Sequence, residues 1–265
     1  KKWKETDKTV ALVHGLCGSH RSPYMQRVAK KLLKKGYKVA RINLRGCGSG
    51  RGYAKNIYNQ ESSNDIFSAI KELKKDAPRS SLSVVGFSLG GNIILKMAQE
   101  YHAEMKDLVT QMICINPPLH IESTMNHITN TPLYEQVFFH ALKKDIDFRN
   151  KRFEELPPLE ISSKMTLSEL NEYYIAPISG FDNVKDYYSR CSAIWSLDKI
   201  KTPCHILLSK DDPIVDYTLI DPSKLPKELK LIVTEKGGHL GFVGNPLKKE
   251  GLFWMDSKII SWLES

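Results

Sequence analysis

The sequence predicts an α/β protein built on a mostly parallel β-sheet with helices on both faces. Short apolar runs rich in β-branched residues recur along the chain, amphipathic helical segments separate them, and glycines or prolines mark where segments end. Parallel strands require a connection that crosses the sheet, usually a helix, so this alternation indicates such a sheet.

The expected elements follow one another in a regular order. Hydrophobic periodicity predicts strands at residues 9–13, 37–42, 82–85, 111–115, 205–209 and 229–234. It predicts helices at residues 24–35, 64–75, 92–101 and 256–263, of which the second begins with Asn64 as its cap.

The alternation breaks between residues 118 and 203. This stretch holds no clear strand and is rich in Tyr, Phe, Lys and Glu. We therefore expect a single domain over residues 1–265, with residues 118–203 as a helical cap insertion within it. The chain begins without Met and runs almost directly into the first strand, so we expect that early strands of the domain have been trimmed.

Composition limits the class of protein. Of the 265 residues, 41% are hydrophobic, which is ordinary for a globular chain, and none of the apolar runs approaches the length of a membrane span. The charged first residues do not resemble a signal peptide. Five scattered cysteines without a C-x-x-C pair favour reduced thiols, and hence a cytoplasmic location, over a disulfide framework.

The net charge of +9 does not by itself imply a nucleic-acid partner. The lysines fall in helical patterns at residues 30–35 and 71–75, which is typical of solvated helix faces, and aromatic residues do not interleave them. We expect neither nucleic acid nor an integral membrane segment. The sequence does not predict an oligomeric state.

The most informative motif is Gly86-Phe87-Ser88-Leu89-Gly90, between a predicted strand and a predicted helix. A serine hydroxyl is well exposed on a sharp strand-to-helix turn, and glycines two residues before and after it allow that turn to pack. The order strand, Gly-x-Ser-x-Gly, helix predicts that Ser88 is a catalytic nucleophile.

A serine nucleophile requires a base, and the base requires an orienting acid. His239 lies in a glycine-bounded loop directly after the last predicted strand, so we expect it to be the base. The acid is expected after the preceding strand, where Asp211 and Asp212 are both candidates. We favour Asp212, because it stands three residues before the apolar Val215, and Asp211 remains the alternative.

Two backbone N–H groups are expected to stabilise the oxyanion. Leu89 follows the nucleophile at a helix N-terminus, and Leu16 lies in the glycine-rich loop after the first strand. His14 is expected to hold that loop through a backbone hydrogen bond. Cys17 lies nearby but lacks the strand-to-helix turn that a nucleophile requires.

Cofactor motifs are absent from the sequence. The glycine-rich residues 43–50 lack the G-K-[ST] of a nucleotide-binding loop, and the histidines show neither an i, i+4 pair nor H-E-x-x-H. We expect no cofactor and no metal ion.

Together these segments resemble the YheT-type branch of the α/β-hydrolase fold. The resemblance rests on His14-Gly15-Leu16, Arg45-Gly46-Cys47-Gly48, Ser88-Leu89-Gly90-Gly91-Asn92, Asp211-Asp212-Pro213 and Gly237-Gly238-His239-Leu240-Gly241-Phe242. It implies carboxylic-ester hydrolysis, with relatives that act on lipid acyl chains or make medium-chain ethyl esters.

The predicted function is a serine hydrolase that cleaves carboxylic esters of short to medium acyl chains, or lipid-like substrates, through an acyl-enzyme. Acyl transfer to an alcohol on the same triad is one alternative, and a non-catalytic scaffold that binds a ligand or partner is another. Apolar residues of the insertion are candidates for an acyl pocket and equally for ordinary core between its helices: Leu133, Tyr134, Val137, Phe138, Phe139, Tyr173 and Tyr174.

Overall fold

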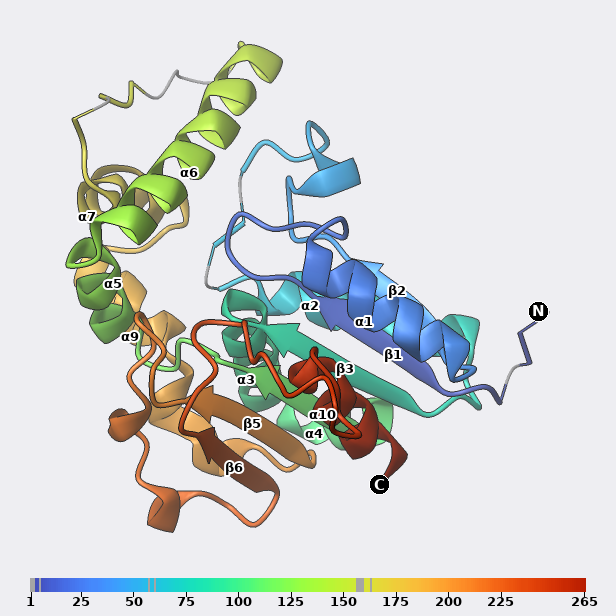
Figure 1. Cartoon of the computed structure of the whole chain (residues 1–265). Coiled ribbons are helices and arrows are strands. Elements are labelled where there is room, and N and C mark those ends of the chain that lie inside the picture. Colours follow the sequence, from blue (N-terminus) through green and yellow to red (C-terminus); the bar gives the residue numbers. More distant parts are fainter. Residues whose placement is uncertain (1–2, 5, 57, 60, 156–159, 163) are drawn as a thin grey trace.

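A six-stranded parallel sheet forms the centre of the molecule, so the predicted fold class is confirmed (Figure 1). The computed structural model describes residues 3–4, 6–56, 58–59, 61–155, 160–162 and 164–265. The strands are β1 (Thr9–Val13), β2 (Lys38–Ile42), β3 (Leu82–Phe87), β4 (Gln111–Ile115), β5 (Cys204–Ser209) and β6 (Leu229–Thr234). They lie in the order β2-β1-β3-β4-β5-β6, and every neighbouring pair is parallel.

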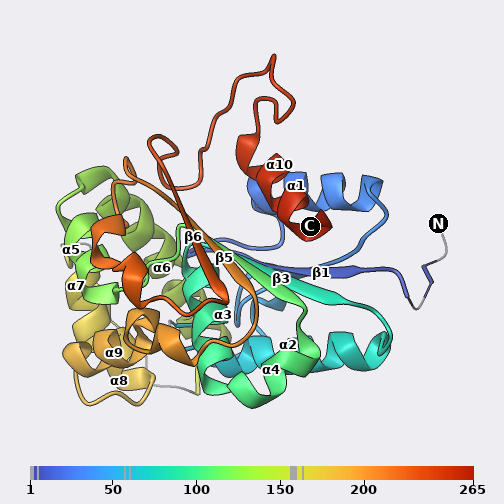
Figure 2. The same cartoon turned by 90° about the horizontal axis from the view of Figure 1, so that it is seen from below.

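Helices cover both faces of the sheet. They are α1 (Pro23–Lys34) and α10 (Trp254–Glu264) on one face, and α2 (Ser63–Asp76), α3 (Leu89–Glu100) and α4 (His102–Leu108) on the other (Figure 2). The strands alternate accordingly: Val10 and Leu12 pack with α1 and α10, whereas Ala11 and Val13 pack with α2 and α3. The central strands β1 and β3 are thus buried on both sides, as is typical of a parallel sheet, whereas the edge strands β2 and β6 are only partly buried.

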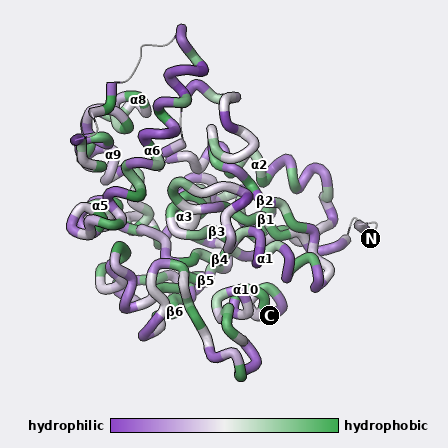
Figure 3. Tube along the Cα trace, turned by 45° about the horizontal axis from the view of Figure 1, so that its top comes forward, coloured by the Kyte–Doolittle hydropathy of each residue, from purple (hydrophilic) through white to green (hydrophobic). Residues whose placement is uncertain are grey.

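The stretch between β4 and β5 is helical, and the part of it that the structure describes contains no strand. Its helices are α5 (Ile121–Thr129), α6 (Pro132–Arg152), α7 (Leu167–Leu170), α8 (Ala176–Ile178) and α9 (Val184–Cys191). They gather beyond the carboxyl ends of the strands (Figure 1). Figure 3 shows hydrophobic residues along the strands and α3, and a largely hydrophilic outer end of α6.

Two amide side chains of α3 fasten the end of this helical stretch to the sheet layer. Asn92 donates from Nδ2 to the Cys191 carbonyl at 2.9 Å, and its Oδ1 accepts from the Ala193 N–H at 3.2 Å. Gln99 Nε2 donates to the Ala193 carbonyl at 2.6 Å. The asparagine of the Ser-Leu-Gly-Gly-Asn motif therefore has a structural task that its sequence context did not reveal.

Several predicted boundaries were wrong by a few residues. Helix α2 begins at Ser63, not at a capping Asn64, and follows Ser62, whose hydroxyl is occupied with the backbone of Asn59. Helix α3 begins at Leu89, directly after the nucleophile candidate, and α4 was not predicted. Strand β2 begins one residue late because the Tyr37 N–H still bonds back to Leu32 at the end of α1.

Across the described ranges, the helices are too short or too polar for a bilayer crossing.

Candidate active site

Ser88 occupies a strained turn between β3 and α3. Its φ of 51° lies in the left-handed region, which a residue with a side chain adopts only when its surroundings enforce it. A Cβ on Gly86 would lie 2.5 Å from the Gly90 carbonyl oxygen, and one on Gly90 would lie 2.5 Å from the His14 carbonyl oxygen. Both glycines are therefore required for this turn to pack.

The structure brings Ser88, His239 and Asp212 into one hydrogen-bonded chain. Ser88 Oγ lies 2.8 Å from His239 Nε2, and His239 Nδ1 lies 2.8 Å from Asp212 Oδ2. A carboxylate only accepts hydrogen bonds, so Nδ1 carries the proton and Nε2 is free to accept the serine proton. The Asp212 side chain is 1% exposed and that of His239 is 11% exposed, which keeps this chain largely away from water.

Asp212 and Asp211 have separate tasks. Asp212 Oδ1 accepts from the N–H groups of Ile214 and Val215, at 2.9 and 3.1 Å, and these bonds leave Oδ2 for His239. Asp211 instead accepts from the N–H groups of Gly237 and Gly238, both at 2.8 Å. These two backbone hydrogen bonds lower the pKa of Asp211, and the bond from Gly238 has the larger effect. Asp211 thus holds the histidine loop without touching the imidazole.

Two polar side chains at strand ends complete the support of the histidine loop. Asn116 Nδ2 and Ser209 Oγ both donate to the Gly238 carbonyl, at 2.7 and 2.8 Å. Asn116 is fully buried and has a φ of 42°. Sequence reasoning missed both residues. The signal for Asn116 was its place between a strand and two prolines, since asparagine tolerates the left-handed conformation.

The loop after β1 approaches Ser88 closely, because β1 and β3 are neighbours in the sheet. A Cβ on Gly15 would lie 3.1 Å from Ser88 Cβ. The Gly15 N–H donates to Tyr24 Oη at 3.0 Å, and the Cys17 N–H donates to Tyr58 Oη at 2.7 Å. Among the described residues, the N–H of Leu16 between them finds no acceptor, nor does the N–H of Leu89. Both donors remain available to a ligand.

His14 is structural, as predicted. It is fully buried, its Nδ1 donates to the Gly15 carbonyl at 2.8 Å, and its Nε2 accepts from the Leu44 N–H at 3.1 Å. Burial lowers the pKa of His14 to about 4, so its imidazole is neutral at physiological pH. It links the loops that follow β1 and β2.

Cys17 is a poor nucleophile in this setting. Burial raises its pKa to about 12, so the thiol stays protonated, whereas nucleophilic attack needs the thiolate. Cys17 Sγ faces the Phe138 carbonyl of α6 at 4.0 Å. Helix α6 therefore lies against the loop that carries Leu16.

Helix α6 also lies near Asp212. The pKa of Tyr134 is raised, chiefly by burial and further by the negative charge of Asp212. The helical stretch thus lies over the carboxyl ends of the strands near Ser88, where α/β folds commonly bind ligands.

A largely apolar pocket begins at Leu16 and Leu89 and extends under the helical stretch. It holds about 410 Å³ of space, part of which is open to solvent. Its apolar walls include Ile121, Met125, Leu142 and Leu167.

The apolar residues that sequence reasoning proposed for such a pocket do not line it. Leu133, Val137 and Tyr173 are 71%, 55% and 71% exposed, and Phe139 and Tyr174 are packed in the core instead. Tyr134 and Phe138 are partly buried against that core. Of the two alternatives, core packing holds for Phe139 and Tyr174. The sequence could not decide between the alternatives, because aromatic content does not reveal which face of a helix points inward.

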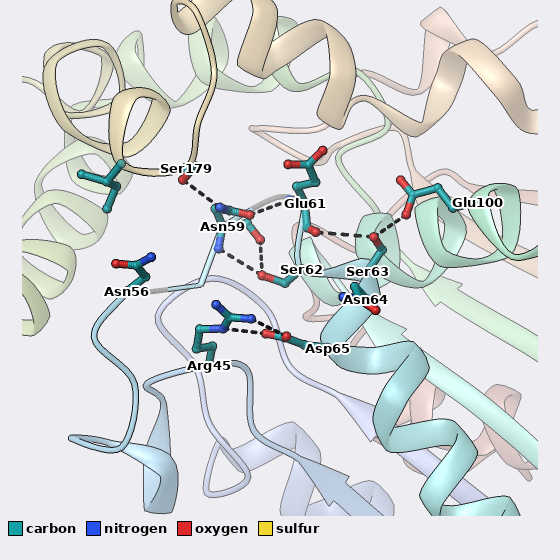
Figure 4. A pocket seen from close by; sticks show the side chains of 11 residues that line it. Arg45, Asn56, Asn59, Glu61, Ser62, Ser63, Asn64, Asp65, Glu100 and Ser179 are labelled. Carbon is teal, nitrogen blue, oxygen red and sulfur yellow. Dashed lines mark hydrogen bonds and ion pairs between the residues drawn. The ribbon is translucent and has the colours of Figure 1, made fainter.

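A second, polar pocket shares Asn59 with the first. Figure 4 shows its lining. It holds about 920 Å³, part of which is open to solvent, and Arg45 and Asp65 form a bidentate ion pair within its lining. The arginine of the Arg-Gly-Cys-Gly motif therefore anchors the segment after β2 to α2. Metal-binding clusters of three or more His, Cys, Asp or Glu side chains do not occur among the described residues.

Fold and site geometry together define an α/β hydrolase. The chain matches the α/β hydrolase fold family over residues 8–246 and belongs to that family. It is 28% identical over 261 residues to YheT of Escherichia coli (strain K12), which is named as an esterase, and the match covers 96% of this chain and 76% of YheT. The resemblance to YheT-type hydrolases is thereby confirmed.

Other relatives agree with this placement. The monoacylglycerol lipase of Saccharomyces cerevisiae is 26% identical over 243 residues, which cover 87% of this chain and 54% of the lipase. The chain thus spans about half the length of that relative. The solved structure of the esterase Pf2001 from Pyrococcus furiosus matches with a TM-score of 0.60 at 19% identity, covering 98% of this chain and 83% of Pf2001, and shows the shared fold.

Proposed function

We propose that this α/β hydrolase is a serine esterase that cleaves carboxylic esters. The observation that carries the proposal is the chain from Ser88 Oγ through His239 to Asp212, with 2.8 Å at each step. Such a chain gives a serine hydroxyl a base to accept its proton and gives that base a fixed orientation. The named relatives, an esterase and a monoacylglycerol lipase, support ester substrates.

The reaction begins when Ser88 Oγ attacks the ester carbonyl and His239 Nε2 accepts the serine proton. Negative charge develops on the carbonyl oxygen, where the N–H groups of Leu16 and Leu89 stabilise it. The tetrahedral intermediate then expels the alcohol, which takes the proton from His239. An acyl chain remains bonded to Ser88 Oγ.

Water completes the cycle. His239 accepts a proton from a water molecule that attacks the acyl-enzyme, and the second tetrahedral intermediate releases the carboxylic acid as His239 returns a proton to Ser88 Oγ. Asp212 keeps the His239 Nδ1–H in place and stabilises the imidazolium that forms twice in the cycle.

We assign the acyl chain of the substrate to the apolar pocket. The pocket starts at Leu16 and Leu89, the two proposed oxyanion donors, and its walls are largely apolar, as an acyl chain requires. In this proposal residues 118–203 act as a cap within one domain. Support comes from the contacts of α6 with Cys17 and from its proximity to Asp212.

Hydrolysis of p-nitrophenyl esters of graded acyl length tests the proposal. The unmodified protein should hydrolyse short and medium esters, and Ser88→Ala should lower kcat by at least about 10³-fold, because the nucleophile is lost. Ser68→Ala, at an exposed position of α2, is the matched control and should leave kcat unchanged.

Two results would contradict the proposal. One is an unmodified protein that turns over none of these esters, as a non-catalytic scaffold would behave. The other is activity that persists in Ser88→Ala. Adding an alcohol and measuring ester exchange against hydrolysis separates acyl transfer from hydrolysis on the same triad.

A further inference from the structure

Asn59 stands between the apolar pocket and the polar pocket. Of the described residues that line the two pockets, it is the one that belongs to both. Leu16 and Leu89, beside the proposed nucleophile, lie on the apolar side. Glu61 and Glu100 lie on the polar side (Figure 4). A ligand chain that enters the apolar pocket at Leu16 and Leu89 therefore meets Asn59 before it meets the carboxylates.

The side chain of Asn59 is held at both ends. Its Nδ2 donates to Ser179 Oγ at 2.8 Å, and its Oδ1 accepts from the Glu61 N–H at 2.8 Å. Its backbone is fixed as well, because the Asn59 N–H donates to Ser62 Oγ at 3.2 Å and Ser62 Oγ donates back to the Asn59 carbonyl at 2.9 Å. Figure 4 shows these bonds converging on Asn59.

Ser179 directly follows α8, in the helical stretch between β4 and β5, whereas Asn59 belongs to the segment that joins β2 to α2. The two residues are 120 positions apart in the chain. Their hydrogen bond therefore closes a bridge from the sheet layer to the proposed cap at the place where the two pockets adjoin.

We propose that the Asn59–Ser179 hydrogen bond is the end wall of the acyl pocket and sets the longest acyl chain that the enzyme accepts well. The inference rests on the proposed esterase function and adds the residues that determine its chain-length specificity.

The contrast between the two pockets explains why this wall would decide chain length. Each methylene that enters the apolar side leaves water and improves binding roughly fourfold. Past Asn59 an alkyl chain would displace water from Glu61 and Glu100, and burying charged groups against an apolar chain is costly. Burial already raises the pKa of Glu61 despite its neighbour Arg190. Each added methylene therefore strengthens binding up to Asn59 and weakens it beyond Asn59.

The test is the profile of kcat/KM against acyl length, from p-nitrophenyl acetate to palmitate, for Asn59→Ala, Ser179→Ala and the double variant. In the unmodified enzyme kcat/KM should rise with length, reach an optimum and fall. Each single variant should raise the ratio of kcat/KM for laurate over butyrate by about 16-fold, equivalent to two methylenes at roughly fourfold each. The double variant should add nothing further, because both changes remove one bond.

Asn56→Ala is the matched control. Asn56 lines the polar pocket but is exposed and has no part in the bridge, so its profile should coincide with that of the unmodified enzyme. Thermal unfolding of each variant identifies any that fails to fold, in which case the other single variant carries the test.

The inference is overturned if the optimum stays in place in a folded Asn59→Ala or Ser179→Ala enzyme, or if Asn56→Ala shifts it equally. Those results leave the esterase function intact, since all variants would still hydrolyse the series. If the unmodified protein hydrolyses none of the esters, the esterase function fails and this inference fails with it.

Discussion

Two tyrosine hydroxyls accept the N–H groups on either side of Leu16, so the Leu16 N–H stays available to a ligand. Tyr24 accepts from Gly15, and Tyr58 accepts from Cys17. Cys17 has a φ of 56°, a conformation that is unfavourable for a residue with a side chain. The bond to Tyr58 therefore holds a strained residue directly beside a proposed oxyanion donor, which makes Tyr58 a positioning residue.

Tyr58→Phe should lower kcat about 10- to 100-fold and change KM little. Without the hydroxyl the Cys17 N–H loses its acceptor, the loop relaxes, and Leu16 no longer points its N–H at the developing charge; direct loss of an oxyanion donor costs about 10²–10³-fold. Steady-state kinetics on p-nitrophenyl butyrate measures the split between kcat and KM.

Tyr53→Phe is the control for that substitution, because Tyr53 lies in the same connecting segment and is 88% exposed. Unchanged kcat in a folded Tyr58→Phe protein would show that the loop does not need this bond. A rise in KM alone would place Tyr58 in substrate binding instead.

Ser88, His239 and Asp212 could be proposed from the sequence, since the motif and the positions directly after predicted strands limited the candidates. It could not identify Tyr58, Asn116 or Asn59. Their partners lie 41, 122 and 120 positions away along the chain, and long-range hydrogen bonds leave no local pattern.

Among the elements, the turn from β3 to α3 leaves no space for a side chain at its glycines. Its glycines contact backbone and not flexible side chains: Gly86 faces Gly90 and Gly91, and Gly90 faces Val13 and His14. Backbone cannot rotate away as a side chain can, so a single added methyl group must displace a strand or a helix.

Gly86→Ala should destabilise the protein by about 3 kcal/mol, at the upper end of the usual cost of overpacking, and should abolish esterase activity by moving Ser88. Gly50→Ala is the control, because a Cβ at Gly50 meets no atom within 4 Å and its φ is negative or extended. Urea denaturation gives the two free energies of unfolding. Equal stability of both variants would mean that the turn is less tightly packed than described.

Strands and long amphipathic helices were predictable because their periodicity is local. Helix α4 was not, since it follows α3 with only Tyr101 between them and reads as one continuous segment. Within the helical stretch, the buried faces depend on which helix packs on which, so the sequence could not assign its apolar residues to pocket or core.

The whole molecule is organised so that the loops after four strands meet at the carboxyl ends of the sheet. Neighbouring β1 and β3 bring Leu16 to Ser88, and the adjacent β5 and β6 bring Asp212 to His239. On the far face α10 is fixed to α1 through the fully buried Asp256, which pairs with Arg27 and Lys31 at 2.7 and 3.0 Å. A rigid sheet with both faces covered thus positions residues that are distant in sequence.

Labelling with a fluorophosphonate probe tests the central claim, that Ser88 is a nucleophile activated by His239. Attack by Ser88 Oγ on phosphorus would expel fluoride and leave one adduct, which peptide mass spectrometry locates. The account predicts modification at Ser88, with a rate that falls at least about 10³-fold in His239→Ala because the serine keeps its proton. Modification elsewhere, or equally fast labelling of Ser88 in His239→Ala, would contradict it.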